Sequence, residues 1–236
     1  MPALRREPEH HRPLHPQGGE RRGLRHRRQR QPGPDRDAHR QDRRLGANPA
    51  RLAPVAGRAL GLLALGILGW QVFARGLDFL RASAALRFLH GVNLIFHEAG
   101  HTLFLFFGQF LHILGGSALQ VIVPAVCAGY FLVHRQTASF AVALFWTGES
   151  ITDVAIYMAD ARTRALPLLG GDGVMHDWNY LLSALGLLNW TGALAGLTFG
   201  VGMLTILAAL GLLVLDLAQA WQRAHPSAGA GTWRQP

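Results

Sequence analysis

The sequence predicts an all-α protein, a polytopic membrane bundle of about six transmembrane helices that follows a disordered N-terminal segment. Three observations lead to this fold class. Half of the 236 residues are hydrophobic, and between positions 51 and 222 they form runs of about 20 residues, the length that crosses a bilayer as a helix. The basic residues gather instead in the first 50 positions. The single cysteine, Cys127, can form no internal disulfide, which excludes a cysteine-stapled secreted fold and a Cys-rich zinc module.

Residues 1–50 differ from the rest of the chain in composition. They hold 13 of the 23 arginines against six acidic residues, and they contain almost no aliphatic side chains. Such a segment cannot bury enough apolar surface to offset its chain entropy, so we expect disorder there and in the short tail 223–236. No aromatic side chains are interleaved among the arginines, so we expect no nucleic-acid partner. The composition equally fits a start codon assigned too early, with translation beginning near Leu45 to Val55.

The membrane domain, residues 51–222, begins with the apolar run Leu52–Ala74, which is interrupted only by Arg58 near its start. A single arginine close to the end of a span can extend its charge to the interface, so this run predicts the first span. Residues 75–90 alternate charged side chains with Leu and Phe. This pattern is typical of an amphipathic connector that lies at the membrane surface.

Three further spans are predicted between Gly91 and Ala159. They are Gly91–Leu114, ended by Gly115 and Gly116, then Ala118–Val133 with a kink at Pro124, and Thr137–Ala159. A polar loop follows and runs to Asp177. From Asn179 to Trp221 the chain is apolar for 43 residues, roughly twice the length of one span. We interpret it as two helices that turn near Asn189–Gly196, and a single re-entrant arrangement is the alternative.

Six spans place both termini on the same side of the membrane. The arginines on that side would be Arg51, Arg162, Arg164, Arg223 and Arg234. The positive-inside rule assigns this side to the cytoplasm, although four other arginines fall opposite. We therefore expect an integral protein of the bacterial inner membrane with cytoplasmic termini and the lipid bilayer as its first partner.

The second predicted span contains the pattern HExxH, formed by His97, Glu98 and His101. On a helix the two histidines lie one turn apart on one face, where both imidazoles can reach the same ion. The glutamate between them is placed to take a proton from a water at the metal. Zinc suits this set because it binds nitrogen and carboxylate ligands and keeps a position open for water. Ionisable groups within a span are costly unless they are paired or bind a metal, which favours a functional site here.

A third ligand has to come from elsewhere in the chain, and the sequence offers two candidates. Glu149 and Asp153 are four residues apart in the fourth predicted span, and so share one face. This spacing is similar to the glutamate-zincin arrangement. By that likeness Glu149 would bind zinc, and Asp153 would accept a hydrogen bond from the far nitrogen of a ligand histidine.

The alternative ligand lies just before the fifth predicted span, in the segment GGDGVMHDW. Zinc proteases of the site-2 protease type take an aspartate from the start of a later span, and Asp177 occupies a comparable place. His176 could bind the ion equally well. If Glu149 is the ligand instead, His176 becomes a candidate catalytic residue that donates a hydrogen bond to the tetrahedral oxyanion.

HEAGH within an apolar helix, with acidic residues in later spans, resembles the integral-membrane zinc metalloproteases of the site-2 protease group. The resemblance covers the second span and one loop, and no Asn-Pro-Asp-Gly or Leu-Asp-Gly motif precedes the fifth span. It implies a zinc-dependent peptidase that cuts a membrane-protein or peptide substrate in or near the bilayer. Two alternatives use the same residues. One is a non-enzymatic membrane protein that binds or transports metal ions, and the other is hydrolysis of a lipid or another amide.

Overall fold

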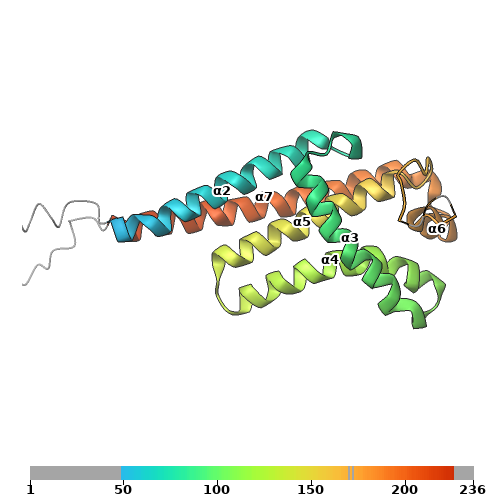
Figure 1. The fold of residues 1–236 in the computed structure, drawn as a ribbon, viewed down its shortest axis with the longest axis horizontal. Helices are drawn as coiled ribbons and strands as arrows, with labels where there is room; N and C mark the ends of the chain where they lie inside the picture. The colour runs from blue at the N-terminus through green and yellow to red at the C-terminus, as the bar shows by residue number, and fades with distance from the viewer. Residues whose placement is uncertain (1–48, 170, 172, 226–236) are drawn as a thin grey trace, which may run out of the picture. The chain divides into compact units, whose positions relative to one another are not determined.

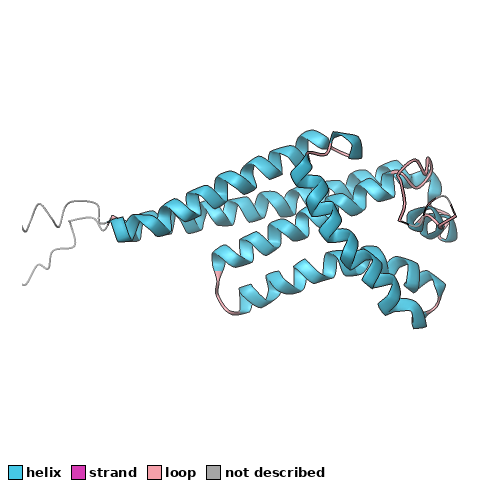
Figure 2. Ribbon diagram, in the orientation of Figure 1, coloured by secondary structure: helices cyan, strands magenta, loops and turns pink. Residues whose placement is uncertain are grey.

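The computed structural model in Figure 1 describes residues 49–169, 171 and 173–225. In that part of the chain every regular element is a helix, as the colours of Figure 2 show. The α-helices are α2 (Pro49–Arg75), α3 (Ala84–Phe104), α4 (Gln109–Val133), α5 (Thr137–Ala159), α6 (Asp177–Ala184) and α7 (Thr191–Ala224). Short 3-10 helices, η1 (Phe79–Arg81), η2 (Leu105–Phe107) and η3 (Leu188–Trp190), lie in the connections. The all-α prediction is confirmed, whereas residues 1–48 and 226–236, for which we predict disorder, lie outside the described residues.

Helices α2 and α5 both pack along α7 and run antiparallel to it (Figure 1). An ion pair between Arg58 Nε and Asp216 Oδ2, 2.6 Å apart, joins the start of α2 to the end of α7. Where α5 crosses α7, a Cβ atom on Gly148 would lie 2.8 Å from the carbonyl oxygen of Gly202. Only glycine lets the two backbones approach so closely. The core beside this crossing contains Val72, Leu86, Phe145, Ile206 and Ala209.

Helices α3 and α4 form an antiparallel hairpin that brings the HExxH helix into direct backbone contact with its neighbour. A Cβ atom on Gly100 would overlap the carbonyl oxygen of Gly115. The chain reverses through η2 and Gly108, whose φ of +88° lies in the region that favours glycine. At the other end of α3, the Ser83 hydroxyl accepts a hydrogen bond from the Leu86 N–H and caps the helix.

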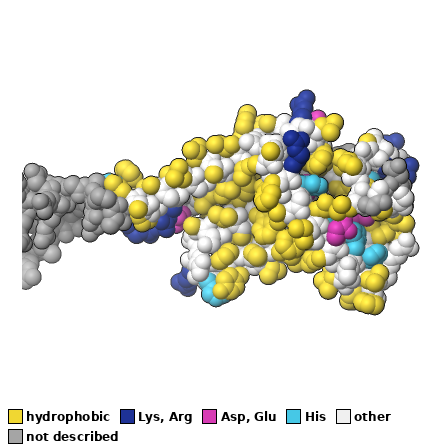
Figure 3. All heavy atoms as spheres, in the orientation of Figure 1, with side chains coloured by type: hydrophobic (Ala, Val, Ile, Leu, Met, Phe, Trp, Pro, Cys, Tyr) yellow, Lys and Arg dark blue, Asp and Glu magenta, His cyan; other side chains and the backbone are white. Residues whose placement is uncertain are grey.

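Three helical segments are long and apolar enough to cross a membrane: Leu52–Arg75, Gln109–Val133 and Leu188–Ala224. Hydrophobic side chains cover much of the face seen in Figure 3. The side chains of Trp70 and Phe106, for example, are 66% and 90% exposed. Apolar surface on this scale is typical of a face that contacts lipid or another protein.

The predicted boundary between the second and third spans is wrong, whereas the predicted end of the third span at Val133 is confirmed. The expected helix Gly91–Leu114 is interrupted at η2, so α3 ends at Phe104 and α4 begins at Gln109. Gly115 and Gly116 therefore lie inside α4 and do not end a span. The positive φ of Gly108 allows a sharp reversal there, and the apolar character of the flanking residues hides it from a reading of hydropathy.

The last apolar segment also differs from the prediction of two helices that turn near Asn189–Gly196. The turn comes earlier, after α6, which ends at Ala184 and is followed by Gly186 at a φ of +67°. With eight residues α6 is about 12 Å long, far short of a bilayer's apolar thickness of about 30 Å. Helix α7 then continues unbroken for 34 residues. Of the six α-helices in the described chain, α6 is therefore no transmembrane span.

The predicted grouping of arginines on one side is wrong as well. Arg162 and Arg164 follow the end of α5, and Arg223 lies at the end of α7. Because α5 and α7 are antiparallel, these arginines lie at opposite ends of the bundle. Thr198, close to the start of α7, contacts Met158, close to the end of α5, at 4.0 Å between Oγ1 and Sδ. The distribution of arginines therefore assigns no side to the cytoplasm.

Candidate metal centre

Two histidines and one aspartate form a group that can hold a metal ion. His97 and His101 lie one turn apart on the same face of α3, as their spacing predicts. The Oδ2 atom of Asp177 lies 2.9 Å from Nε2 of His97 and 3.2 Å from Nε2 of His101. The three ligand atoms lie within 4.8 Å of one another. We call these residues the His-His-Asp group.

The start of α6 brings Asp177 to the histidines, although 80 residues separate it from His97. The backbone N–H of Asp177 donates to the Tyr157 hydroxyl at 3.1 Å, which fixes the first turn of α6 against α5. Burial raises the pKa of the Asp177 carboxyl, but the hydrogen bonds from His101 and His97 outweigh burial and hold the pKa below its usual value. The carboxyl is therefore ionised at neutral pH and is a ready metal ligand.

Each histidine is oriented by a hydrogen bond at its other ring nitrogen. His97 Nδ1 lies 3.2 Å from Oε1 of Gln120, and His101 Nδ1 lies 3.0 Å from the carbonyl oxygen of His112. Both partners are acceptors, so each ring donates a hydrogen bond from Nδ1. Each Nε2 faces the Asp177 carboxylate at hydrogen-bond distance. A ring that donates from Nδ1 binds a metal through Nε2.

A hydrogen-bonded chain extends from His97 across three helices. Gln120, in α4, donates from Nε2 to Oδ2 of Asp153 at 3.2 Å. Asp153, in α5, also lies 2.9 Å from Nδ1 of His90, on α3. We predicted that Asp153 would accept a hydrogen bond directly from a ligand histidine. In the structure Gln120 lies between Asp153 and His97. Asp153 accepts a hydrogen bond from the Gln120 amide nitrogen, and the amide oxygen accepts one from His97.

Helix α4 closes the opposite side of the His-His-Asp group through Gly116. A Cβ atom built on Gly116 would lie 2.7 Å from Nε2 of both His97 and His101. Any larger residue would occupy the space where an ion bound to both nitrogens would sit. The absence of a side chain at Gly116 therefore keeps this space open.

A cavity of about 340 Å³ opens beside the His-His-Asp group, and Glu98 lines it. Much of its wall is apolar, with contributions from Leu94 on α3, Val154 on α5 and Leu168 in the loop that follows α5. In the view of Figure 3, acidic and histidine side chains gather toward the end that carries α6, on a largely hydrophobic face. Glu98 thus faces the same space as the proposed ligands, as HExxH predicts.

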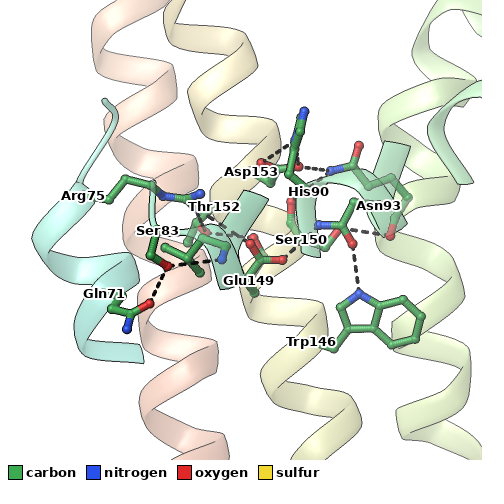
Figure 4. A network of polar contacts seen from close by, with 12 residues as sticks. Gln71, Arg75, Ser83, His90, Asn93, Trp146, Glu149, Ser150, Thr152 and Asp153 are labelled. Carbon is green, nitrogen blue, oxygen red and sulfur yellow. Dashed lines mark hydrogen bonds and ion pairs between the residues drawn. The ribbon is translucent and has the colours of Figure 1, made fainter. Parts of the chain in front are cut away.

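Glu149, the first candidate for the third ligand, lies in a different polar network (Figure 4). Its Oε2 accepts a hydrogen bond from Asn93 Nδ2 at 2.9 Å, and its Oε1 lies 3.9 Å from Nη2 of Arg75. Both side chains of this ion pair are fully buried. Trp146 donates to the oxygen of Asn93 at 2.9 Å and completes the network. The structure does not bring Glu149 to the two histidines, and Asp177 lies there instead.

His176, the candidate oxyanion donor, is engaged in holding α6. Its Nδ1 accepts a hydrogen bond from the backbone N–H of Asn179 at 3.3 Å and caps the helix. Its Nε2 lies 3.3 Å from Oδ2 of Asp160. Burial lowers the pKa of the His176 ring. Within the described residues, His176 is not part of the cavity wall, and its contacts position its neighbour Asp177.

Sequence reasoning missed four residues of this site: Gln120, His112, Gly116 and Tyr157. Gln120 and Gly116 carry no charge and match no motif. On an unbroken helix from Gly91 to Leu114, His112 would lie about three turns beyond His101, but it lies on α4, where its Nδ1 donates back to the carbonyl of His101 at 2.7 Å. A helix break recognised at Gly108 would have signalled this contact.

Nothing matches this chain in comparisons with family models, curated proteins and solved structures. The geometry of the His-His-Asp group and its cavity is therefore the basis for a functional conclusion.

Proposed function

We propose that the chain is a membrane-embedded, zinc-dependent peptidase that hydrolyses a peptide bond in or near the bilayer. The observation that carries the proposal is the convergence of His97, His101 and Asp177 on one point beside a cavity lined by Glu98. Three of the long helices have the apolar length that a bilayer requires. The apolar cavity walls suit an uncharged segment of a substrate.

The donor set fits zinc. Two imidazole nitrogens and one carboxylate oxygen are typical ligands of a catalytic zinc site, in which a fourth position stays open. The acceptors at both Nδ1 atoms leave Nε2 as the nitrogen of each ring that would bind the ion. The space that a Cβ on Gly116 would fill is available to it. When bound, zinc would acidify a water and polarise the carbonyl of the scissile bond.

Glu98 performs the proton transfers in this mechanism. Its carboxylate accepts a proton from the attacking water as the water oxygen forms a bond to the carbonyl carbon. The carbonyl electron pair moves onto the oxygen. When the C–N bond breaks, Glu98 returns the proton to the leaving nitrogen, so that acid and amine products form and Glu98 is regenerated.

The test compares Glu98→Gln with the wild type, using the full chain purified in detergent and loaded with Zn²⁺. The substrates are fluorescence-quenched peptides with apolar residues on both sides of the central bond. We expect the variant to bind zinc in the same stoichiometry and to lose about 10²–10⁴-fold in cleavage rate. Asp78→Asn, a matched loss of one carboxylate in the connector before η1, should leave the rate unchanged.

Two outcomes would contradict the proposal. Cleavage by Glu98→Gln at the wild-type rate would remove the glutamate from the chemistry. Zinc-loaded wild type that cleaves none of the peptides would favour the non-enzymatic alternative, in which the same residues bind a metal for structure or transport.

A further inference from the structure

Tyr157, near the end of α5, lines the same cavity as Glu98 and the His-His-Asp group. Its ring meets the His97 ring edge-on, with centroids 5.8 Å apart. On another side it packs against the His176 ring at 4.4 Å. These two contacts fix the ring before any ligand enters the cavity.

The hydroxyl of Tyr157 is tied to the His-His-Asp group by a single hydrogen bond. Its oxygen accepts from the backbone N–H of Asp177 at 3.1 Å. In that bond the hydroxyl is the acceptor, so its own proton is not used. Among the described residues none accepts a hydrogen bond from that proton. The proton is available to a group in the cavity.

Few other donors in the described cavity wall could serve the same purpose. Arginine is not among the residues that line it, and the chain has no lysine. The amide of Gln120 is already directed at Asp153. His90 lies seven residues before His97, about 10 Å along the helix axis, and its Nδ1 is also occupied by Asp153.

We propose that Tyr157 is a catalytic residue whose hydroxyl donates a hydrogen bond to the oxyanion formed from the scissile carbonyl. This inference rests on the proposed peptidase function. As water adds to the carbonyl carbon, the π-electron pair moves to oxygen, and the Tyr157 O–H stabilises that charge without transferring its proton. The electron pair on oxygen re-forms the C=O bond when the C–N bond breaks. A donor fixed in advance by its neighbours stabilises such a charge most effectively.

The experiment uses two probes that separate donation from structural support. The full chain is loaded with Co²⁺ in detergent, and binding is followed by the visible absorption of the ion. A phosphinic dipeptide with apolar side chains mimics the tetrahedral oxyanion, whereas benzyl mercaptan binds the ion through sulfur and presents no oxyanion. For Tyr157→Phe we expect phosphinate affinity to fall about 10²-fold, with thiol affinity and Co²⁺ content unchanged.

Tyr130→Phe and Tyr180→Phe are matched controls, since these are the other two tyrosines of the chain, and both should bind the probes like wild type. Unchanged phosphinate affinity in Tyr157→Phe would overturn the inference. An equal loss for both probes would also overturn it, because Tyr157 would then act only by positioning Asp177. If wild type binds Co²⁺ and the thiol but not the phosphinate, the inference falls together with hydrolysis. If wild type binds no Co²⁺, the proposed metal centre itself fails.

Discussion

The side-chain oxygen of Gln120 lies 3.2 Å from Nδ1 of His97, and this contact determines which nitrogen of His97 faces Asp177. A donated proton at Nδ1 leaves Nε2 as the ligand nitrogen. Gln120 is itself held by Asp153 and by the carbonyl of Ser150. The orientation of one metal-binding histidine on α3 therefore depends on α4 and α5.

We predict that Gln120→Leu weakens zinc binding about 10–100-fold, the usual effect of losing a partner that orients a ligand histidine. The variant leaves the buried Nδ1–H of His97 without an acceptor and removes the preference for one tautomer. Competition with a chromophoric chelator measures the affinity. Gln136→Leu, at an exposed glutamine before α5, provides the control. Equal affinities in the two variants would show that His97 needs no orienting partner.

Gly116→Ala should abolish stoichiometric zinc binding without unfolding the protein. Its new methyl group would lie 2.7 Å from both ligand nitrogens, where the ion would have to bind. Gly129→Ala on the same helix α4 meets nothing within 4 Å, and should bind zinc normally while gaining about 0.5–1 kcal/mol of stability from its higher helix propensity. Metal content by mass spectrometry and thermal unfolding in detergent report the two effects. Full zinc content in Gly116→Ala would place the ion elsewhere.

Asp177→Asn and Glu149→Gln together test which acid is the third ligand. The neutral amide at position 177 can no longer supply an anionic oxygen between the two histidines, so zinc content should fall severely in that variant. Glu149 pairs with Arg75 and Asn93, so Glu149→Gln should retain zinc in every preparation that remains folded. Near-UV circular dichroism identifies those preparations. The reverse pattern would restore Glu149 as the ligand.

The local parts of the site could be predicted from the sequence, and the long-range parts could not. That His97 and His101 share a face follows from helix periodicity alone. The choice between Glu149 and Asp177 depends on how the loop after α5 folds back, and both are acids beside apolar runs. The pairing of Glu149 with Arg75 could not be predicted for a related reason. The alternation in residues 75–90 predicts an interfacial connector, but the side chain of Arg75 is fully buried.

The fold, like the site, could be predicted from the sequence only in part. Hydropathy located α5 to the residue and α2 to within three residues, because each is bounded by polar or turn residues. It failed at Gly108 and near Gly186, where single glycines with positive φ reverse or end a helix inside an apolar stretch. Burial and hydrophobicity do not distinguish such a glycine from Gly192 or Gly196, which remain helical in α7. Only the packing of α3 on α4 shows why the break occurs where it does.

The buried pair of Arg75 and Glu149 leads to a prediction about stability that is independent of the metal. Arg75 Nε and Nη1 and Glu149 Oε1 have no hydrogen-bond partner in the described structure, so the pair is incompletely satisfied. Removing one member leaves an uncompensated buried charge, and Arg75→Met should therefore destabilise the protein by about 3–5 kcal/mol. Replacing both by methionine should recover most of this loss, because the second charge disappears as well.

The pair between Arg81 Nε and Asp78 Oδ2, 3.3 Å apart, is a natural control for this cycle, since the two side chains are 73% and 48% exposed. Arg81→Met should cost no more than about 1 kcal/mol, because water replaces the lost partner of an accessible carboxylate. Unfolding midpoints in detergent at one pH and salt concentration compare the four variants, including Glu149→Met alone. If the double variant is as unstable as Arg75→Met, packing around the two side chains, and not the unpaired charge, determines the loss. Recovery in the double variant would mean that this ion pair stabilises the bundle little, and that its charges persist in an apolar core only because each requires the other.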